Sequence, residues 1–251
     1  MENASFVALS RQMVLQRQMD LIANNIANVS TPAFKGERLV FAEYLAQTDP
    51  MAAADQSKLS YVEDVGQVRD TSNGSFTPTG NSLDLAIRGS GYFVVDTPLG
   101  QRFTRNGRFT LDANGRIVTS EGYAVLDSNS QPLVVPPDAS DIQIAQDGTV
   151  TVKEPGIPTV ETQIGQINLV QFNNEQAMKM GGNGLYSSTE TPQPAPSSAI
   201  VQGMVEEANV QPVLELTRMI GTQRAFDSAE NLIRADDQME TDAIDKLTRT
   251  S

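Results

Sequence analysis

Residues 15–29 read LQRQMDLIANNIANV, and this stretch decides the fold class. Its large apolar side chains recur at intervals of four, three, four and three residues, at Leu15, Met19, Ile22, Ile26 and Val29. That spacing places them on one stripe of an α-helix. Neither glycine nor proline occurs between residues 4 and 29. The sequence therefore predicts a helix over 4–29, about 39 Å long. It should end at Ser30-Thr31-Pro32, because the residue before a proline avoids the α region.

A second long helix is predicted at the C-terminal end of the chain. Pro212 suits a first helical turn, and the nearly forty residues after it contain one glycine, Gly221, and no proline. Its apolar stripe comprises Leu216, Met219, Phe226, Ala229, Leu232, Ile233, Met239, Ala243, Ile244 and Leu247. A helix of about 55 Å cannot bury such a stripe against a small globule. We expect its partner to be the first helix, neighbouring subunits, or both.

Between the helices, the pattern predicts an antiparallel β domain. Asn-Gly and Asp-Gly pairs, the strongest short-range hairpin signal, recur between short strand-like runs. These runs are 92–95, 108–111, 116–119, 133–135, 141–145, 149–152 and 166–172. The predicted fold class is thus α+β, with the terminal helices paired as a coiled coil and a central all-β, antiparallel domain. The predicted division is 1–34 for the N-terminal helix, 35–79 for an extended or irregular connector, 80–203 for the β domain and 204–251 for the C-terminal helix.

Composition excludes several functions. The chain has 251 residues without cysteine, histidine or tryptophan, so a Ser-His-Asp triad, a Cys/His zinc site, a disulfide and a redox pair are all impossible. The formal net charge of −13 argues against nucleic acid, whose binding needs Lys and Arg to neutralise phosphates. The sequence shows no apolar run long enough to insert in a membrane and no signal-peptide pattern at residues 1–20. The hydrophobic share of 39% suggests an elongated molecule, or one whose apolar faces meet other subunits.

Three motifs that could carry chemistry have simpler interpretations. The GxG at 89–91 is followed by a strand and not by the helix of a phosphate loop, so we interpret it as a tight turn. The polar run 127–131 lacks the glycine and the final glutamate of a calcium loop. The acids of 236–245 are typical of a solvated or subunit-facing helix surface. We therefore predict no catalytic residue, no metal site and no cofactor.

Three asparagines near the end of the first helix, Asn24, Asn25 and Asn28, are poor helix formers. Two explanations remain open at this point. The helix end could fray, or the side-chain amides could pair across a helix-helix seam and fix its register.

Four motifs together resemble one known family, the bacterial flagellar rod and hook proteins. Residues 23–34 (ANNIANVSTPAF) resemble its N-terminal signature. Residues 84–95 (DLAIRGSGYFVV) and 103–118 (FTRNGRFTLDANGRIV) are similar to its strand and double-hairpin motifs. Residues 206–210 (EEANV) and 222–226 (TQRAF) are similar to its C-terminal motifs. The likeness covers nearly the whole chain in the family's order, and the modest length leaves no room for the outer domains of hook proteins.

The resemblance implies a structural role. In this family the two terminal helices pair as a coiled coil and line an axial tube, with the β domain outside. Subunits leave the cell through the flagellar type III export apparatus without a cleaved signal and assemble in the periplasm. Phe41 and Leu45 fit the pattern of an export-gate motif, or alternatively an aromatic-leucine pair on one helical turn.

We therefore predict a non-enzymatic subunit of the proximal rod, polymerising into a helical tube that transmits torque. Its partners would be copies of itself, other proximal and distal rod subunits and the export apparatus. A distal rod subunit is the alternative. A secreted carboxylate glycan hydrolase, which needs two facing carboxylates, and a scaffold that binds a partner helix are remoter ones. The predicted interface comprises Leu15, Met19, Ile22, Asn24, Asn25, Ile26, Asn28, Val29, Leu216, Met219, Phe226, Ala229, Ile233 and Leu247.

Overall fold

The computed structural model describes residues 2–46, 59–139, 141–153 and 161–249. It divides into two compact units. The helical unit comprises Met1–Ala27, Glu37–Asp70 and Gln211–Ser251, and the β unit comprises Asn28–Gly36 and Thr71–Val210. The structure thus confirms two terminal helices and a largely β middle.

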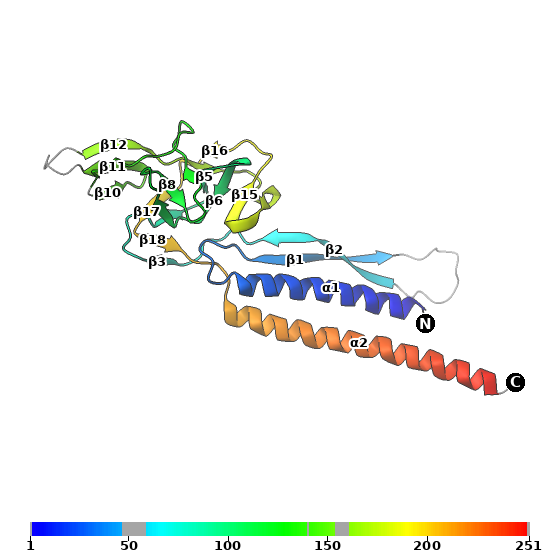
Figure 1. Ribbon diagram of the computed structural model, residues 1–251. Coiled ribbons are helices and arrows are strands. Elements are labelled where there is room, and N and C mark those ends of the chain that lie inside the picture. Colours follow the sequence, from blue (N-terminus) through cyan, green and yellow to red (C-terminus); the bar gives the residue numbers. More distant parts are fainter. Residues whose placement is uncertain (1, 47–58, 140, 154–160, 250–251) are drawn as a thin grey trace. The chain divides into compact units, whose positions relative to one another are not determined.

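The helical unit contains α1 (Glu2–Ala27) and α2 (Pro212–Arg249). The two helices contact each other and run in opposite directions (Figure 1). Helix α1 ends two residues before the predicted position, because a turn takes over, in which the Thr31 amide donates to the Asn28 carbonyl over 3.0 Å.

A long hairpin completes the helical unit. Strands β1 (Glu37–Ala46) and β2 (Leu59–Arg69) pair antiparallel, from Glu37 opposite Arg69 to Ala46 opposite Leu59. A register shift between Val40 and Phe41 interrupts the ladder. Both strands also contact α1. The segment 35–79, for which we expected an extended or irregular connector, therefore holds a regular hairpin and the short β3.

The β unit is built from short antiparallel strands (Figure 1). Its main sheet has the order β14-β15-β6-β5-β9-β8-β7, with β13 pairing with β5 and with β16. Strands β10, β11 and β12 form a three-stranded sheet, and two-stranded ribbons join β4 to β17 and β3 to β18. The bounds are β3 (Phe76–Pro78), β4 (Leu85–Arg88), β5 (Tyr92–Thr97), β6 (Gly100–Thr104), β7 (Phe109–Leu111), β8 (Ile117–Thr119), β9 (Ala124–Val125), β10 (Asp141–Ile144), β11 (Thr149–Lys153), β12 (Glu161–Gln166), β13 (Leu169–Gln171), β14 (Lys179–Met180), β15 (Leu185–Ser187), β16 (Gln193–Pro194), β17 (Ala199–Gln202) and β18 (Met204–Glu206). Two 3₁₀ turns, Glu175–Ala177 and Gly182–Gly184, lie among them.

Strand β5 lies at the centre of the β unit and is buried on both faces. Because successive side chains point to opposite faces, Phe93 and Val95 enter the larger apolar core, while Tyr92 and Val94 enter a smaller aromatic one. In the larger core the rings of Phe93 and Phe109 meet edge to face, with centroids 5.1 Å apart.

Several sequence expectations for this unit need correction. Residues 133–135 form no strand, and Val134 makes only an isolated bridge to Arg116. The Asn-Gly pairs at 73–74 and 106–107 do not turn hairpins. Gly74 and Gly107 instead pass so close to the backbone of Glu207 and Leu85 that a Cβ at either would overlap a carbonyl oxygen. Asn114-Gly115 and Asp147-Gly148 do turn hairpins, β7-β8 and β10-β11.

Candidate functional site

The predicted interface residues of the helical unit are only partly covered within the chain. Ile22 and Ala229 are buried. Six further residues of this set are half-buried, namely Leu15, Met19, Ile26, Met219, Phe226 and Ile233. Leu216 is exposed, while the side chain of Leu247 lies outside the described residues. Contact between α1 and α2 therefore leaves much of the predicted stripe accessible.

Further apolar side chains that sequence reasoning did not place in the interface also face solvent. Together with Leu216, the exposed large apolar residues among the described side chains of the two helices are Leu9, Met13, Val213, Leu214, Ile220, Leu232 and Met239. A hollow of about 430 Å³ lies among Gln12, Met13, Gln16, Arg17, Asp20 and Phe226. We call the exposed residues the open stripe. Leu216 was predicted in the interface, and Leu232 and Met239 belong to the predicted stripe of the second helix. The other five were not predicted, because a strict seven-residue register selects a narrower face than the one left uncovered.

The three asparagines take different positions. Asn25 is buried, and its amide pairs with the backbone of Glu37, donating from Nδ2 to the carbonyl over 2.9 Å and accepting from the amide over 3.0 Å. Asn28 lies in the turn after α1 with Val29, where its Oδ1 accepts from the Thr31 hydroxyl over 3.2 Å. Asn24 is exposed. The amide of Asn25 thus holds the start of β1; the helix end is not frayed there, and this amide does not pair across to α2.

Phe41 and Leu45 both lie on β1, with backbone partners Asp64 and Ser60 on β2. The alternative of an aromatic-leucine pair on a helical turn is therefore wrong. Their side chains lie outside the described residues.

A buried ionic cluster, not anticipated from the sequence, lies in the β unit. The Glu206 carboxylate accepts from Lys35 Nζ over 2.6 Å and from Arg105 Nε over 2.8 Å. It also accepts from the Gly74 amide over 3.0 Å. All three side chains are at most 3% exposed. We call Lys35, Arg105 and Glu206 the ionic cluster.

Both cations of the cluster have further acceptors. Lys35 Nζ donates to the Ser72 carbonyl over 2.7 Å. The Arg105 guanidinium donates to the carbonyls of Gly89 and Gly91 over 2.6 and 2.9 Å, and to the Asn73 side chain over 2.7 Å. Burial lowers the pKa of Lys35, and the Glu206 carboxylate opposes that effect. The neighbouring Arg105 guanidinium also lowers the pKa of Lys35, because two like charges lie close together.

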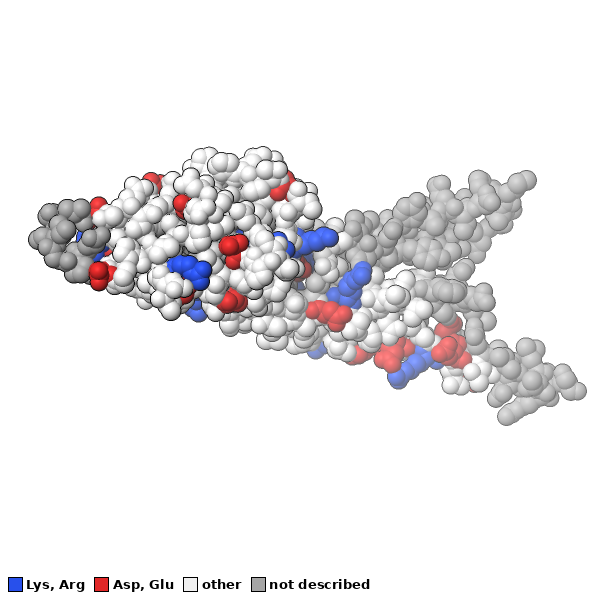
Figure 2. Space-filling model, turned by 45° about the horizontal axis from the view of Figure 1, so that its top comes forward, with Lys and Arg blue, Asp and Glu red and all other residues white. Residues whose placement is uncertain are grey.

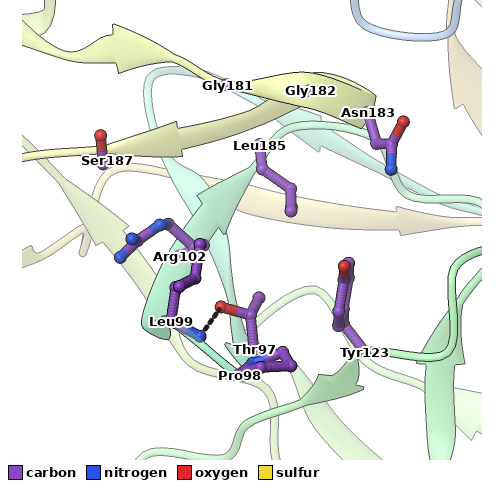
Figure 3. Close-up of a pocket in the computed structure, with 10 residues that line it drawn as sticks. All are labelled: Thr97, Pro98, Leu99, Arg102, Tyr123, Gly181, Gly182, Asn183, Leu185 and Ser187. Atoms are coloured by element: carbon purple, nitrogen blue, oxygen red, sulfur yellow. Dashed lines mark hydrogen bonds between the residues drawn. The ribbon is translucent and has the colours of Figure 1, made fainter.

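A pocket of about 400 Å³ lies on the β unit beside the β5-β6 turn (Figure 3). Its lining includes Leu99, Arg102, Tyr123 and Leu185, and it contains no carboxylate. The paired acids that a glycan hydrolase needs are therefore not provided by this pocket. Over the described part of the chain, no three Asp or Glu side chains come close enough together to hold a metal ion.

On the face shown in Figure 2, basic and acidic side chains of the described residues are interspersed among uncharged ones, and some of opposite charge lie next to each other. Neither of the described helices has the length and apolar composition needed to cross a membrane.

Comparison with known proteins identifies the family. The profile described as "Flagella basal body rod protein" matches residues 7–35, "Flagellar hook protein FlgE/F/G D1 domain" matches 86–152, and "Flagellar basal body rod FlgEFG protein C-terminal" matches 201–246. The flagellar basal-body rod protein FlgF of Caulobacter vibrioides is 37% identical over 98% of both chains. The chain belongs to the flagellar basal-body rod protein family. It is accordingly a structural rod subunit of the bacterial flagellar basal body.

Other relatives within the rod family bear on the type of subunit. FlgF of Mesorhizobium japonicum is 34% identical over 98% of both chains. FlgG of Buchnera aphidicola subsp. Schizaphis graminum is 36% identical over 89% of this chain and 92% of its own. The likeness to FlgF thus extends over more of the chain, and FlgG is not favoured over it. These relatives are structural rod proteins and not enzymes.

Each of the three segments matched by the family profiles contains one residue of the ionic cluster. Lys35 is the last residue of the first matched segment, Arg105 lies in the second, and Glu206 lies in the third. Each residue stands inside or directly after a motif quoted above. The pairing itself could not be predicted, because 171 residues separate Lys35 from Glu206.

Proposed function

We propose that this chain is a subunit of the proximal rod, which polymerises with copies of itself and with other rod subunits into a helical tube that transmits torque. The observation that carries the proposal is the open stripe. Among the described side chains, eight large apolar ones on the two helices face solvent in the single chain. Large apolar side chains left exposed in such number on two helices favour an interaction surface.

The physical reason for assembly is the burial of this stripe. Removing apolar surface from water contributes about 25 cal/mol per Å², or about 1.5–3 kcal/mol for a fully buried leucine or methionine. Several such side chains covered at once give a contact that holds under load. The open stripe has members on both α1 and α2. The exposed residues of α1 in one copy could therefore pack against those of α2 in the next copy, which would be a contact between unlike surfaces. Heterologous contacts of that kind build an open helix where the rotation does not close.

Pairing of α1 and α2 as a coiled coil is part of the same proposal. The antiparallel contact between the helices and the burial of Ile22 and Ala229 support it. The half-buried Leu15, Met19, Met219 and Phe226 would complete their packing against helices of neighbouring subunits.

A deletion strain tests the rod assignment. We expect loss of flagella, with basal bodies that lack the rod beyond its base, and recovery when the chain is supplied from a plasmid. A second arm supplies the distal rod protein of the same strain in excess. Recovery by that protein would contradict a distinct proximal position, and normal motility of the deletion strain would contradict any rod role.

We infer that the chain is exported by the flagellar type III apparatus without a cleaved signal and assembles in the periplasm. The support is family membership together with the fit of Phe41 and Leu45 to the export-gate pattern. Export acts on unfolded chains, so the position of these residues on β1 in the folded state is compatible with their recognition. Phe41→Ala/Leu45→Ala should reduce secretion, whereas the matched Val40→Ala/Ala46→Ser should not. Unchanged secretion at equal intracellular levels would refute the motif.

We also infer that the chain carries no catalytic activity. Its relatives are structural, and the pocket lining offers no paired carboxylates. Purified protein should leave isolated cell walls intact over hours, and release of soluble glycan fragments would contradict this.

A further inference from the structure

The chain passes between its two units at four points, after Ala27, Gly36, Asp70 and Val210, and the ionic cluster joins the segment after α1 to the segment before α2. Lys35 lies in Asn28–Gly36, which follows α1 in the chain. Glu206 ends β18, shortly before α2 begins at Pro212. Gly74 lies just after Thr71, where the chain re-enters the β unit, and Arg105 follows β6 in the body of that unit. The Glu206 carboxylate therefore links the segment before α2, to which it belongs, to the segment after α1 and to the body of the β unit.

Backbone hydrogen bonds reinforce the same junction. The Ala33 amide donates to the Glu206 carbonyl over 2.8 Å, and the Asn209 amide donates to the Phe34 carbonyl over 3.2 Å. The Gly36 amide donates to Asn209 Oδ1 over 2.8 Å. The two connecting segments, 28–36 and 203–210, are thus bonded directly to each other. Glu207 adds a bond from its amide to the Ser75 carbonyl over 2.8 Å.

The charge balance makes this junction sensitive to the loss of Glu206. Two cations share one carboxylate at a site where all three side chains are at most 3% exposed. A buried network is stable only when every member is satisfied, and removal of one partner leaves an uncompensated charge. Glu206 is the member that both cations need, whereas loss of Lys35 still leaves the Glu206–Arg105 pair in balance. The network therefore has one well-satisfied arrangement.

We propose that Lys35, Arg105 and Glu206 form a clamp, which locks the segments after α1 and before α2 to each other and to the β unit. These three are positioning residues, because the clamp fixes the two points at which the helices are attached to the β unit. The use of the clamp in passing load between helices and β unit rests on the proposed function. The clamp itself is a property of the single chain.

Hydrogen exchange of the purified full-length protein tests the clamp. In Lys35→Met, the amides of Ala33, Gly36, Glu207 and Asn209 should exchange at least about tenfold faster. The amides of Ile117 and Leu133, in the main core, should keep their protection. The matched control is Arg116→Gln, which removes the half-buried pair with Asp112 on the same unit, away from the clamp, and should leave the amides of Ala33, Gly36, Glu207 and Asn209 unchanged.

A second pair of variants tests the charge logic. Glu206→Gln should increase exchange of the connecting segments more than Lys35→Met does, because it strands two cations. Adding Lys35→Met to Glu206→Gln should restore part of the protection, or restore folding if Glu206→Gln alone does not fold.

Three outcomes would overturn the clamp. They are unchanged exchange in Lys35→Met, loss of protection by the same factor in the core amides, and no recovery in the double variant. Because all measurements use the monomer, they distinguish failure of the clamp from failure of the rod assignment.

Discussion

At the scale of single residues, Asn25 shows how a polar side chain terminates one element and begins the next. Its amide satisfies both the N–H and the C=O of Glu37 at the first position of β1. An asparagine inside a helix is unfavourable by intrinsic preference, so its position near the end of α1 reflects this tertiary role.

Asn25→Ala should therefore destabilise the protein although alanine is the better helix former. We expect a loss of about 1–2 kcal/mol in the free energy of unfolding, since two backbone groups lose buried partners. Urea titration measures it, with faster exchange of the Glu37 amide as a local readout. The exposed Gln16→Ala should change stability by less than about 0.5 kcal/mol. Equal stability of the two variants would refute the anchoring role.

Gly107 illustrates a glycine required by space rather than by turn geometry. A Cβ there would overlap the carbonyl of Leu85, the first residue of β4. Gly107→Ala should cost at least about 3 kcal/mol, the upper part of the range for overpacking. Gly182, which has open space around it, is the matched control, and Gly182→Ala should be close to neutral. Similar melting temperatures for both variants would contradict the close approach.

Tyr92 makes the stability depend on alkaline pH. Burial raises the pKa of its phenol. The nearby Glu175 carboxylate, which accepts a hydrogen bond from the Tyr92 hydroxyl over 3.2 Å, raises that pKa further. Above pH 10.0, the ordinary value, the unfolded chain releases this proton while the folded chain keeps it, so stability falls as pH rises. The free energy of unfolding of Tyr92→Phe should decline less steeply between about pH 9.5 and 11, a range that brackets the pKa of tyrosine in the unfolded chain. An equally steep decline in both proteins would contradict the burial argument.

At the scale of elements, the two helices differ in how fully single apolar residues are covered. Ile22 is only 5% exposed, whereas Phe226 is half-buried beside Met13 in the hollow described above. Ile22→Ala should therefore cost the isolated chain about 2–5 kcal/mol. Phe226→Ala should cost less, about 1–2 kcal/mol, because part of its ring already faces water.

Denaturant unfolding of the monomer measures both values, and Met13→Ala, at an exposed position, serves as the neutral control. The larger cost of Phe226→Ala, about 3–5 kcal/mol, belongs to a fully buried ring and should appear only when neighbouring subunits cover it. A monomer cost of that size would show that the ring is already covered within the chain.

The elements differ in how well the sequence predicts them. Both helices follow from stripes maintained over many turns, because a period near 3.6 that persists for 26 or 38 residues has no competing interpretation. Strands such as β9, β14 and β16 have two residues each, too few for any alternation to be recognised. Strand β6 was missed because its sequence, GQRFT, has a polar first half.

The sites follow the same division. Candidate interface positions could be chosen from the stripe because neighbours on a helix face are close in sequence. The ionic cluster could not be predicted, because its pairs span 101 and 171 residues and each member alone is a common charged residue. The close-packing roles of Gly74 and Gly107 were hidden for a similar reason, since Asn-Gly pairs signal a turn locally.

At the scale of the whole molecule, the central claim is that the single chain is incomplete: its open stripe is covered only by neighbouring rod subunits. Leu216 and Ile220 belong to this stripe and are 49% and 55% exposed. Replacing both with glutamine should leave the monomer's melting temperature unchanged, since glutamine keeps the helix propensity and little buried surface is lost. The exposed polar pair Gln223→Ala/Asn231→Ala on the same helix is the matched control.

The decisive measurement is the amount of chain that co-purifies with basal bodies when each variant is the only copy in the cell. We predict that Leu216→Gln/Ile220→Gln lowers incorporation at least about tenfold, which corresponds to only about 1.4 kcal/mol of lost contact energy. The control should incorporate normally. Full incorporation of the glutamine variant, with normal swimming, would contradict the claim that this stripe is the assembly surface.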